Sequence, residues 1–162
     1  MTFQDPKYLA IARMYEGEGE SLGPNDSPFI RKILASLNGL WLKGQPWCGS
    51  AMAYWMQQAG LTYPSDYYRA LSWAKWGTNT YEPRLGSVAV LTRQGGGHVG
   101  IVTGVDPAAR MVRLFGANQK DKVSELWFDM RRVTAYRQPI GVTAPLPVAP
   151  LSKVGELSTS EA

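Results

Sequence analysis

The sequence predicts an α+β fold, with helices in its first half and an antiparallel sheet in its second half. Apolar residues recur at helical spacing in three segments before residue 60. From Gly86 onward they form short β-rich runs separated by turns. Helices followed by a series of strands are typical of α+β proteins.

Two helices are predicted before the lone cysteine. The first spans residues 6–15, and the alternating Glu-Gly segment over residues 16–20 ends it. We interpret that segment as a solvated turn, because alternating glycines do not hold metal ligands rigidly. The second helix begins with Ser27 as N-cap and Pro28 in its first turn, and Asn38-Gly39 ends it.

The third predicted helix begins near Cys48. Pro46 suits a helix start, where its missing N–H is not needed, and Gly60 provides a stop. Cys48 lies on the same stripe as the apolar residues of this helix, so its thiol faces the core at the open end. The positive end of the helix dipole favours a thiolate there. A short helix is predicted next, over residues 69–76.

Four strands are predicted, over residues 87–92, 98–105, 111–115 and 133–136. His98 opens the second of them, directly after Gly95-Gly96-Gly97. Glycine within a strand often marks close approach by another backbone or a ligand. We expect the glycines before His98 to leave its imidazole with little cover.

Cys48 and His98 are the only cysteine and histidine among the 162 residues. Each has an ordinary structural interpretation, as a small buried side chain and as a satisfied histidine at a strand end. A cysteine at a helix start and a histidine after a glycine loop are also what a thiolate nucleophile and its base require. We favour this dyad.

A third residue is needed to orient the imidazole of such a pair. Asn118 follows the strand predicted over residues 111–115, and an asparagine can fix the imidazole through its side-chain carbonyl. Taken alone, an asparagine after a strand is an ordinary turn residue.

Six short motifs occur along the chain: Pro46-Trp47-Cys48-Gly49, Ser72-Trp73 with Trp76-Gly77, residues 83–90, Gly97-His98-Val99-Gly100, Gly116-Ala117-Asn118-Gln119 and Tyr136-Arg137-Gln138-Pro139. Together they resemble the papain-like cysteine hydrolases of the NlpC/P60 and CHAP superfamily, in particular a phage-associated branch. The similarity covers residues 8–139. Two positions depart from the family pattern, with Ser87 in place of Asp and Ala117 in place of Gly.

The resemblance implies a papain-like fold with the nucleophile on a helix and the base on the sheet. It implies catalytic roles for Cys48, His98 and Asn118, and bacterial peptidoglycan as the substrate, cleaved at an amide or peptide bond. We expect the Cys48 backbone N–H to stabilise the oxyanion. The bond could be that of an N-acetylmuramoyl-L-alanine amidase or of a stem-peptide endopeptidase, since both use the same dyad.

Aromatic residues flank the cysteine in the sequence. Such clusters are more often core than cleft, but a peptidoglycan groove needs flat apolar walls. We therefore expect Trp47 and Trp73 to contact substrate, together with Gln45. Gln45 or Tyr15 could also supply a side-chain donor to the oxyanion.

Composition restricts the partners. The net charge is +4, but the basic residues are scattered, so we expect no nucleic-acid partner. A mild positive charge favours encounter with an anionic cell envelope. One cysteine and one histidine cannot form the usual zinc site, and the chain has no Asp-rich calcium loop, so we expect no metal or other cofactor. No apolar run is long enough for a membrane span.

We expect one catalytic domain over residues 1–140, a flexible tail over residues 141–162, and a monomer. Residues 1–6 do not read as a signal peptide, which predicts a protein held in the host cytoplasm until it is released to the cell wall. A phage endolysin or related lytic protein fits that route. The alternatives are a non-enzymatic phage structural or effector-associated module, and a cysteine hydrolase that acts on a protein substrate.

Overall fold

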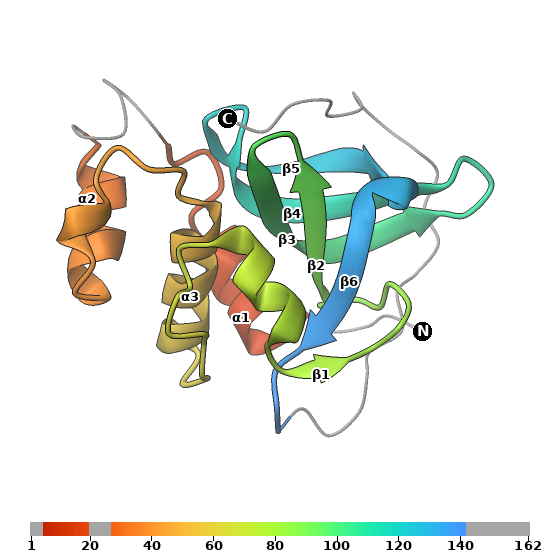
Figure 1. Ribbon diagram of the computed structural model, residues 1–162, viewed down its shortest axis with the longest axis horizontal. Coiled ribbons are helices and arrows are strands. Elements are labelled where there is room, and N and C mark those ends of the chain that lie inside the picture. Colours follow the sequence, from red (N-terminus) through yellow and green to blue (C-terminus); the bar gives the residue numbers. More distant parts are fainter. Residues whose placement is uncertain (1–4, 20–26, 142–162) are drawn as a thin grey trace.

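A computed structural model of the chain describes residues 5–19 and 27–141. Helices come first and an antiparallel sheet follows, so the predicted α+β class is confirmed. Figure 1 shows the α-helices gathered at one side of a strongly curved sheet. The tail predicted over residues 141–162 lies, apart from Gly141, outside the described residues.

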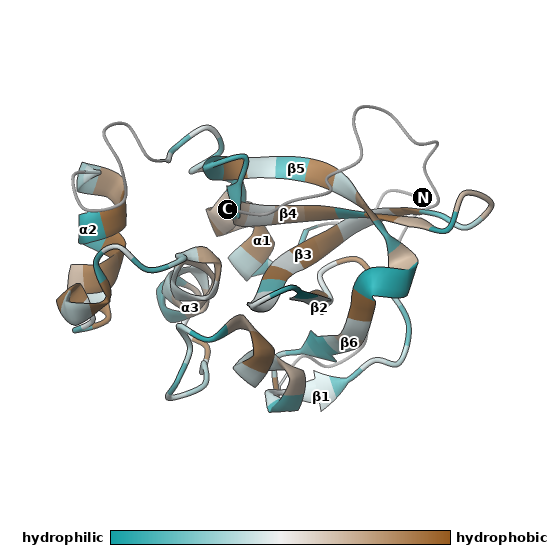
Figure 2. Cartoon of the chain, turned by 45° about the horizontal axis from the view of Figure 1, so that its top comes forward, coloured by the Kyte–Doolittle hydropathy of each residue, from teal (hydrophilic) through white to brown (hydrophobic). Residues whose placement is uncertain are grey.

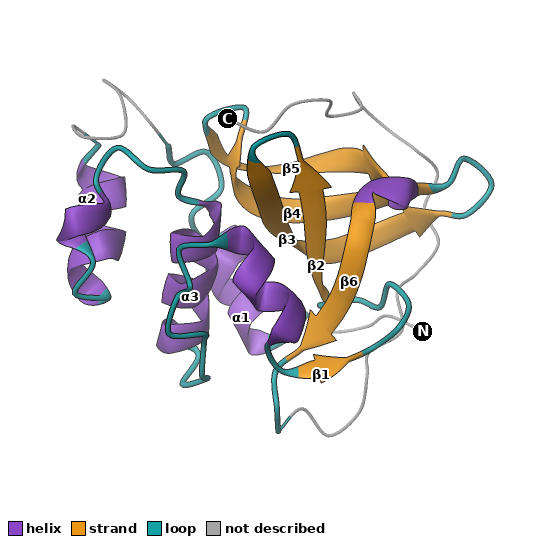
Figure 3. Cartoon of the chain, in the orientation of Figure 1, coloured by secondary structure: helices purple, strands orange, loops and turns teal. Residues whose placement is uncertain are grey.

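The helices and strands occur in a simple order along the chain (Figure 3). The helices are α1 (Lys7–Arg13), α2 (Pro28–Ser36), η1 (Leu40–Leu42), α3 (Cys48–Gln58), η2 (Ala70–Lys75) and η3 (Met130–Arg132), where η denotes a 3₁₀ helix. The strands are β1 (Thr78–Asn79), β2 (Val88–Arg93), β3 (Gly96–Asp106), β4 (Met111–Gln119), β5 (Lys122–Asp129) and β6 (Val133–Gln138).

All neighbouring strands of the sheet are antiparallel, in the order β1-β6-β2-β3-β4-β5. Helix α3 packs against β3 and β4, and α1 and α2 pack against α3. The 3₁₀ helix η2 packs against β2, β3 and β6. The helix layer and the sheet therefore meet where α3 packs on β3, although the starts of these two elements are about 50 residues apart in the sequence.

The sheet is hydrophobic on both faces. One face packs with the helices in a core that includes Trp55, Val99 and Phe115. The other face carries a smaller cluster that includes Val102 and Phe128. Figure 2 shows the resulting long hydrophobic stretches on β3 and β4. Residues that alternate along one strand thus serve two cores, as the side-chain period of two requires.

The sequence prediction missed part of the sheet. It ended the strand containing Phe115 at that residue, whereas β4 continues to Gln119, and it assigned no strand to Lys122–Asp129, which forms β5. Strand β5 is the last strand in the sheet order. Its polar residues are tolerated at this edge, and they interrupt the apolar pattern by which a strand is recognised.

Candidate active site

Cys48 is the first residue of α3 and is almost completely buried. The N-cap residue, Trp47, makes no side-chain cap hydrogen bond. The first backbone N–H groups of an α-helix have no acceptor within the helix. The thiol therefore lies at a helix terminus whose N–H groups and dipole both favour negative charge.

The residue after the cysteine has to be a glycine. A Cβ atom at Gly49 would lie 2.2 Å from the backbone oxygen of Tyr67, far inside van der Waals contact. The loop containing Tyr67 and Tyr68 therefore crosses directly over the first turn of α3. This close approach fixes the loop beside Cys48.

His98 lies near the start of β3, opposite Leu91 of β2, and is buried. Its ring stacks on Phe128, with ring centroids 5.6 Å apart and an interplanar angle of 21°. A Cβ atom at Gly97 would lie 2.5 Å from Cδ2 of Leu71, so η2 packs closely against the residue before the histidine. The expectation that the imidazole has little cover was therefore wrong, because Phe128 of β5 and the close packing of η2 enclose this part of β3.

The structure brings Cys48 and His98 together, as the sequence predicted. Burial by itself raises the pKa of the Cys48 thiol, but a hydrogen bond from His98 and the charge of its imidazolium outweigh burial and lower that pKa below its ordinary value. The Val99 backbone N–H and the positive charge of Arg93 lower the pKa further. The surroundings of the sulfur therefore favour the thiolate, which is the nucleophilic form.

The side chain in contact with the other side of the imidazole is that of Gln119. Its Oε1 lies 2.9 Å from Nε2 of His98. Its Nε2 donates to the backbone oxygens of Leu114, at 3.2 Å, and Ser124, at 2.9 Å. Both amide hydrogens of Gln119 are used in this way, so Oε1 faces the histidine and His98 Nε2 must carry the proton. The other ring nitrogen, Nδ1, is then left for the Cys48 thiol.

Two glycines make room for the Gln119 amide. A Cβ atom at Gly116 would lie 2.7 Å from Oε1 of Gln119, and one at Gly100 would lie 3.4 Å from it. The two positions belong to adjacent strands, β4 and β3. The glycine in the strand after His98 therefore marks a close approach, here by the side chain that holds the histidine.

Asn118 is the residue that the sequence indicated for orienting the imidazole, but its side-chain oxygen makes no hydrogen bond to His98. It is buried, and its Oδ1 has no hydrogen-bond partner among the described residues. Its φ of 59° lies at a break in the β4–β5 register between Gly116 and Gln119. This irregularity sends the next side chain, that of Gln119, onto the histidine, and we therefore assign the orienting role to Gln119 instead.

Trp47 and Trp73, expected to contact substrate, are instead core residues. Only 2% of Trp47 and none of Trp73 is exposed. The Trp73 indole N–H donates to the backbone oxygen of Tyr67, at 3.0 Å, which holds the loop over α3. Large apolar rings are more stable when removed from water than when they line a solvated groove, so both side chains pack into the core.

Gln45 and Tyr15 have different surroundings. Gln45 is exposed in the loop before Cys48, and its predicted contact with substrate stays a prediction. The Tyr15 hydroxyl lies 3.3 Å from that of Tyr54, which is more than one turn along α3 from Cys48. Tyr15 is therefore engaged with the middle of the helix rather than its start.

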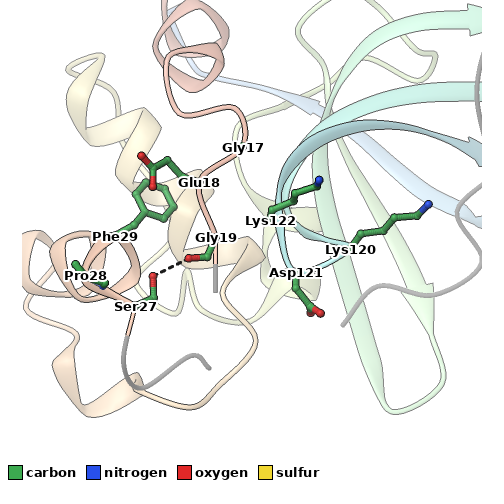
Figure 4. A pocket seen from close by; sticks show the side chains of 9 residues that line it. All are labelled: Gly17, Glu18, Gly19, Ser27, Pro28, Phe29, Lys120, Asp121 and Lys122. Carbon is green, nitrogen blue, oxygen red and sulfur yellow. Dashed lines mark hydrogen bonds between the residues drawn. The ribbon is translucent and has the colours of Figure 1, made fainter. Parts of the chain in front are cut away.

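A hollow of about 410 Å³ adjoins the turn that follows Gln119 (Figure 4). It lies between the segment Gly17-Glu18-Gly19, the start of α2 and the turn Lys120-Asp121-Lys122. The Lys120 and Lys122 side chains point away from Phe29, and Ser27 Oγ donates to Gly19 O at 2.8 Å. Its polar side chains do not converge on one point, so we assign it no catalytic role.

Across residues 5–19 and 27–141, no three His, Cys, Asp or Glu side chains gather closely enough to hold a metal ion. No helix in those ranges has the length and apolar character needed to cross a membrane.

Comparison with known proteins gives one family. Residues 41–118 match the family model described as the CHAP domain. The matched segment contains both Cys48 and His98 and ends one residue before Gln119. The resemblance is thereby confirmed at the level of the NlpC/P60 and CHAP superfamily, and the phage-associated branch stays a prediction. No curated protein matches the chain.

Proposed function

We propose, from the premise that residues 41–118 are a CHAP domain, that the chain hydrolyses an amide or peptide bond in the stem peptide of bacterial peptidoglycan. A CHAP domain indicates a hydrolase of the amidase or peptidase type acting on peptidoglycan. The observation that carries the finer proposal is the chain of contacts from Cys48 to His98 to Gln119.

In the first step, the Cys48 thiolate attacks the carbonyl carbon of the scissile bond. The S–C bond forms while the carbonyl π electrons move onto oxygen, giving a tetrahedral oxyanion. The backbone N–H of Cys48, at the uncapped start of α3, is the donor we propose for that oxyanion. His98, protonated by the thiol through Nδ1, then passes this proton to the leaving amine as the C–N bond breaks.

In the second step, neutral His98 removes a proton from water, and the hydroxide attacks the thioester carbonyl. The C–S bond breaks, the carboxylic acid leaves, and the thiolate is restored beside imidazolium. Gln119 accepts from Nε2–H throughout, which keeps Nδ1 directed at the sulfur in both protonation states. Gln119 is a positioning residue in this scheme, because it acts through the histidine.

The setting we propose is that of a phage endolysin or related lytic protein, made in the host cytoplasm and acting once it reaches the wall. The motif resemblance to a phage-associated branch supports this setting. The positive net charge of +4 also favours approach to an anionic envelope.

The test is digestion of purified insoluble peptidoglycan of several chemotypes by the wild-type chain and by Cys48→Ala. We expect soluble fragments from the wild type alone, and mass spectrometry of their new termini identifies the bond. Release of a free L-alanine amino terminus indicates an amidase, and a new terminus within the stem peptide indicates an endopeptidase. Equal release by Cys48→Ala, or no release from any chemotype, would contradict the proposal.

A further inference from the structure

A hollow of about 320 Å³ opens beside the loop that leads into Cys48. Its lining residues are Trp41, Leu42, Gln45, Pro46, Tyr68 and Arg69. Two of its walls lie next to the segment that carries the cysteine. Pro46 is two residues before Cys48, and the loop carrying Tyr68 crosses Gly49 in close contact. A group bound in this hollow is therefore close to the start of α3.

One wall of the hollow is aromatic and open to solvent. Trp41 is 68% exposed, although its ring meets that of Tyr68 edge to face, with centroids 5.1 Å apart. Trp47, six residues later, is buried. A tryptophan left on the surface beside another ring offers a large rigid contact area to a ligand, with little conformational entropy to lose.

The charged member of the hollow is Arg69. Its guanidinium carbon lies 5.9 Å from the centre of the Tyr68 ring, which holds the side chain over the aromatic wall. Within the described part of the chain, no ion pair to this guanidinium is present. The acid that acts on it through charge is Asp66, whose carboxylate already accepts a hydrogen bond from Ser72 Oγ at 2.6 Å. The guanidinium donors thus remain available to a ligand.

Arg69 also borders a second hollow, of about 600 Å³, which includes Leu71. Leu71 lies against Gly97, the residue before His98. One hollow therefore adjoins the segment carrying the cysteine and the other adjoins the segment carrying the histidine. Arg69 lines both hollows, so an extended peptide that occupies the two together meets its guanidinium.

We propose that Arg69 is a specificity-determining residue that binds a carboxylate of the stem peptide, while Trp41 and Tyr68 form the flat wall on which the same peptide packs. This inference rests on the proposed function, since it names the feature of the stem peptide that is recognised. A guanidinium donates two parallel hydrogen bonds to a carboxylate, whereas a carboxamide can accept only one of them. Replacing the carboxylate by an amide therefore weakens binding.

The test measures binding rather than turnover, on the Cys48→Ala chain. The probe is the synthetic peptide L-Ala-γ-D-Glu-L-Lys-D-Ala in four forms, amidated at the D-Glu α-carboxyl, at the C-terminus, at both or at neither. Titration calorimetry gives each Kd. We expect one of the two carboxylates to improve affinity by about tenfold, the effect of one charge-assisted contact.

Adding Arg69→Gln is expected to abolish that tenfold preference and to leave the affinity for the fully amidated peptide unchanged. Arg131→Gln is the matched control. Arg131 is exposed in η3 and lines neither hollow, so its substitution removes the same charge elsewhere on the surface. Adding Trp41→Ala is expected to weaken all four peptides by a similar factor. Circular dichroism checks the fold of each variant.

Equal affinity for all four forms, no binding of any form, or a preference that survives Arg69→Gln, would overturn the inference. Peptidoglycan digestion by the wild-type chain separates this failure from failure of the proposed function. A chain that digests peptidoglycan but shows no Arg69-dependent preference keeps its function and loses this subsite. A chain that digests none loses the function itself.

Discussion

Oε1 of Gln119 lies 2.9 Å from Nε2 of His98, and this contact fixes the direction of the imidazole. The two hydrogens of the Gln119 amide go to backbone oxygens of Leu114 and Ser124, so the amide cannot turn without losing both bonds. The ring is consequently held with Nδ1 toward Cys48. Gln119 therefore makes the contact with the imidazole that the sequence analysis had assigned to its neighbour, Asn118.

Replacing Gln119 is therefore expected to impair catalysis more than replacing Asn118. We expect Gln119→Ala to lower kcat on peptidoglycan fragments by about tenfold or more with little change in KM, because the general base loses its orientation. Asn118→Gly is the matched control, since glycine accepts the φ of 59° at that position. A larger loss in Asn118→Gly than in Gln119→Ala would return the orienting role to Asn118.

Enlarging Gly116 is expected to have the same effect without touching the catalytic groups. The new Cβ atom in Gly116→Ala would stand 2.7 Å from Oε1 of Gln119, the far end of a flexible side chain, and would push the amide off His98. Activity should fall, and the melting temperature should fall as well, because the displaced amide also loses its bonds to the backbone oxygens of Leu114 and Ser124. Gly96→Ala, whose Cβ meets nothing within 4 Å, is the control.

A double-mutant cycle makes this test specific. If Gly116→Ala acts through the amide, combining it with Gln119→Ala should cost little beyond Gln119→Ala alone. Additive losses from the two substitutions would instead show that the added methyl group harms the enzyme by another route.

The tryptophans of η1 and η2, Trp41 and Trp73, are expected to contribute very different amounts to the free energy of unfolding. Trp73 is fully buried, so Trp73→Ala should lower the free energy of unfolding by about 3–5 kcal/mol. Trp41 is largely exposed, and Trp41→Ala should lower it by about 1 kcal/mol or less, the contribution of one aromatic pair. Urea denaturation of both variants measures this. Similar losses would contradict the assignment of Trp73 to the core and Trp41 to the surface.

Much of the fold could be predicted because local signals agreed with tertiary structure. Ser27 caps α2, with its Oγ accepting from the Ile30 N–H at 3.3 Å, and Pro28 stands in the first turn, as predicted. Cys48 is the first residue of α3, close to the helix start that the sequence signals of Pro46 and Gly60 indicated. Strand β5 was missed because edge strands carry polar residues that hide their apolar pattern.

The juxtaposition of Cys48 and His98 was predictable because each residue is unique in the chain and lies at the end of an element. The third residue was not. Counting from Phe115 cannot decide between Asn118 and Gln119, because the strand register breaks between Gly116 and Gln119 and the alternation of faces is lost. The glycines at 100 and 116 were the available signal, since a gap in two adjacent strands indicates that a side chain fills it.

The expectation that Trp47 and Trp73 contact substrate was wrong for a different reason. Trp47 and Trp73 are close to Cys48 in the motifs, but nearness in sequence does not tell whether a ring faces the groove or the core. Among the tryptophans, all of which the structure describes, the exposed one is Trp41, which no motif contains. The exposed fraction of each ring in the folded chain decides this, and the sequence does not contain it.

The most direct test of this account is the pH dependence of Cys48 alkylation, which needs no substrate. A small reagent such as iodoacetamide suits the nearly buried thiol, and intact-protein mass spectrometry gives the rate. The Cys48 pKa is lowered in the folded chain, so the thiolate persists to lower pH than in the urea-unfolded chain. The rate should rise with pH through a midpoint below that of the unfolded control.

In His98→Ala, burial acts on the thiol without its largest opposing partner, so the midpoint should move upward. Gln119→Ala should shift it in the same direction by a smaller amount. A wild-type midpoint at or above that of the unfolded chain, unchanged by His98→Ala, would contradict the dyad on which the proposed function depends.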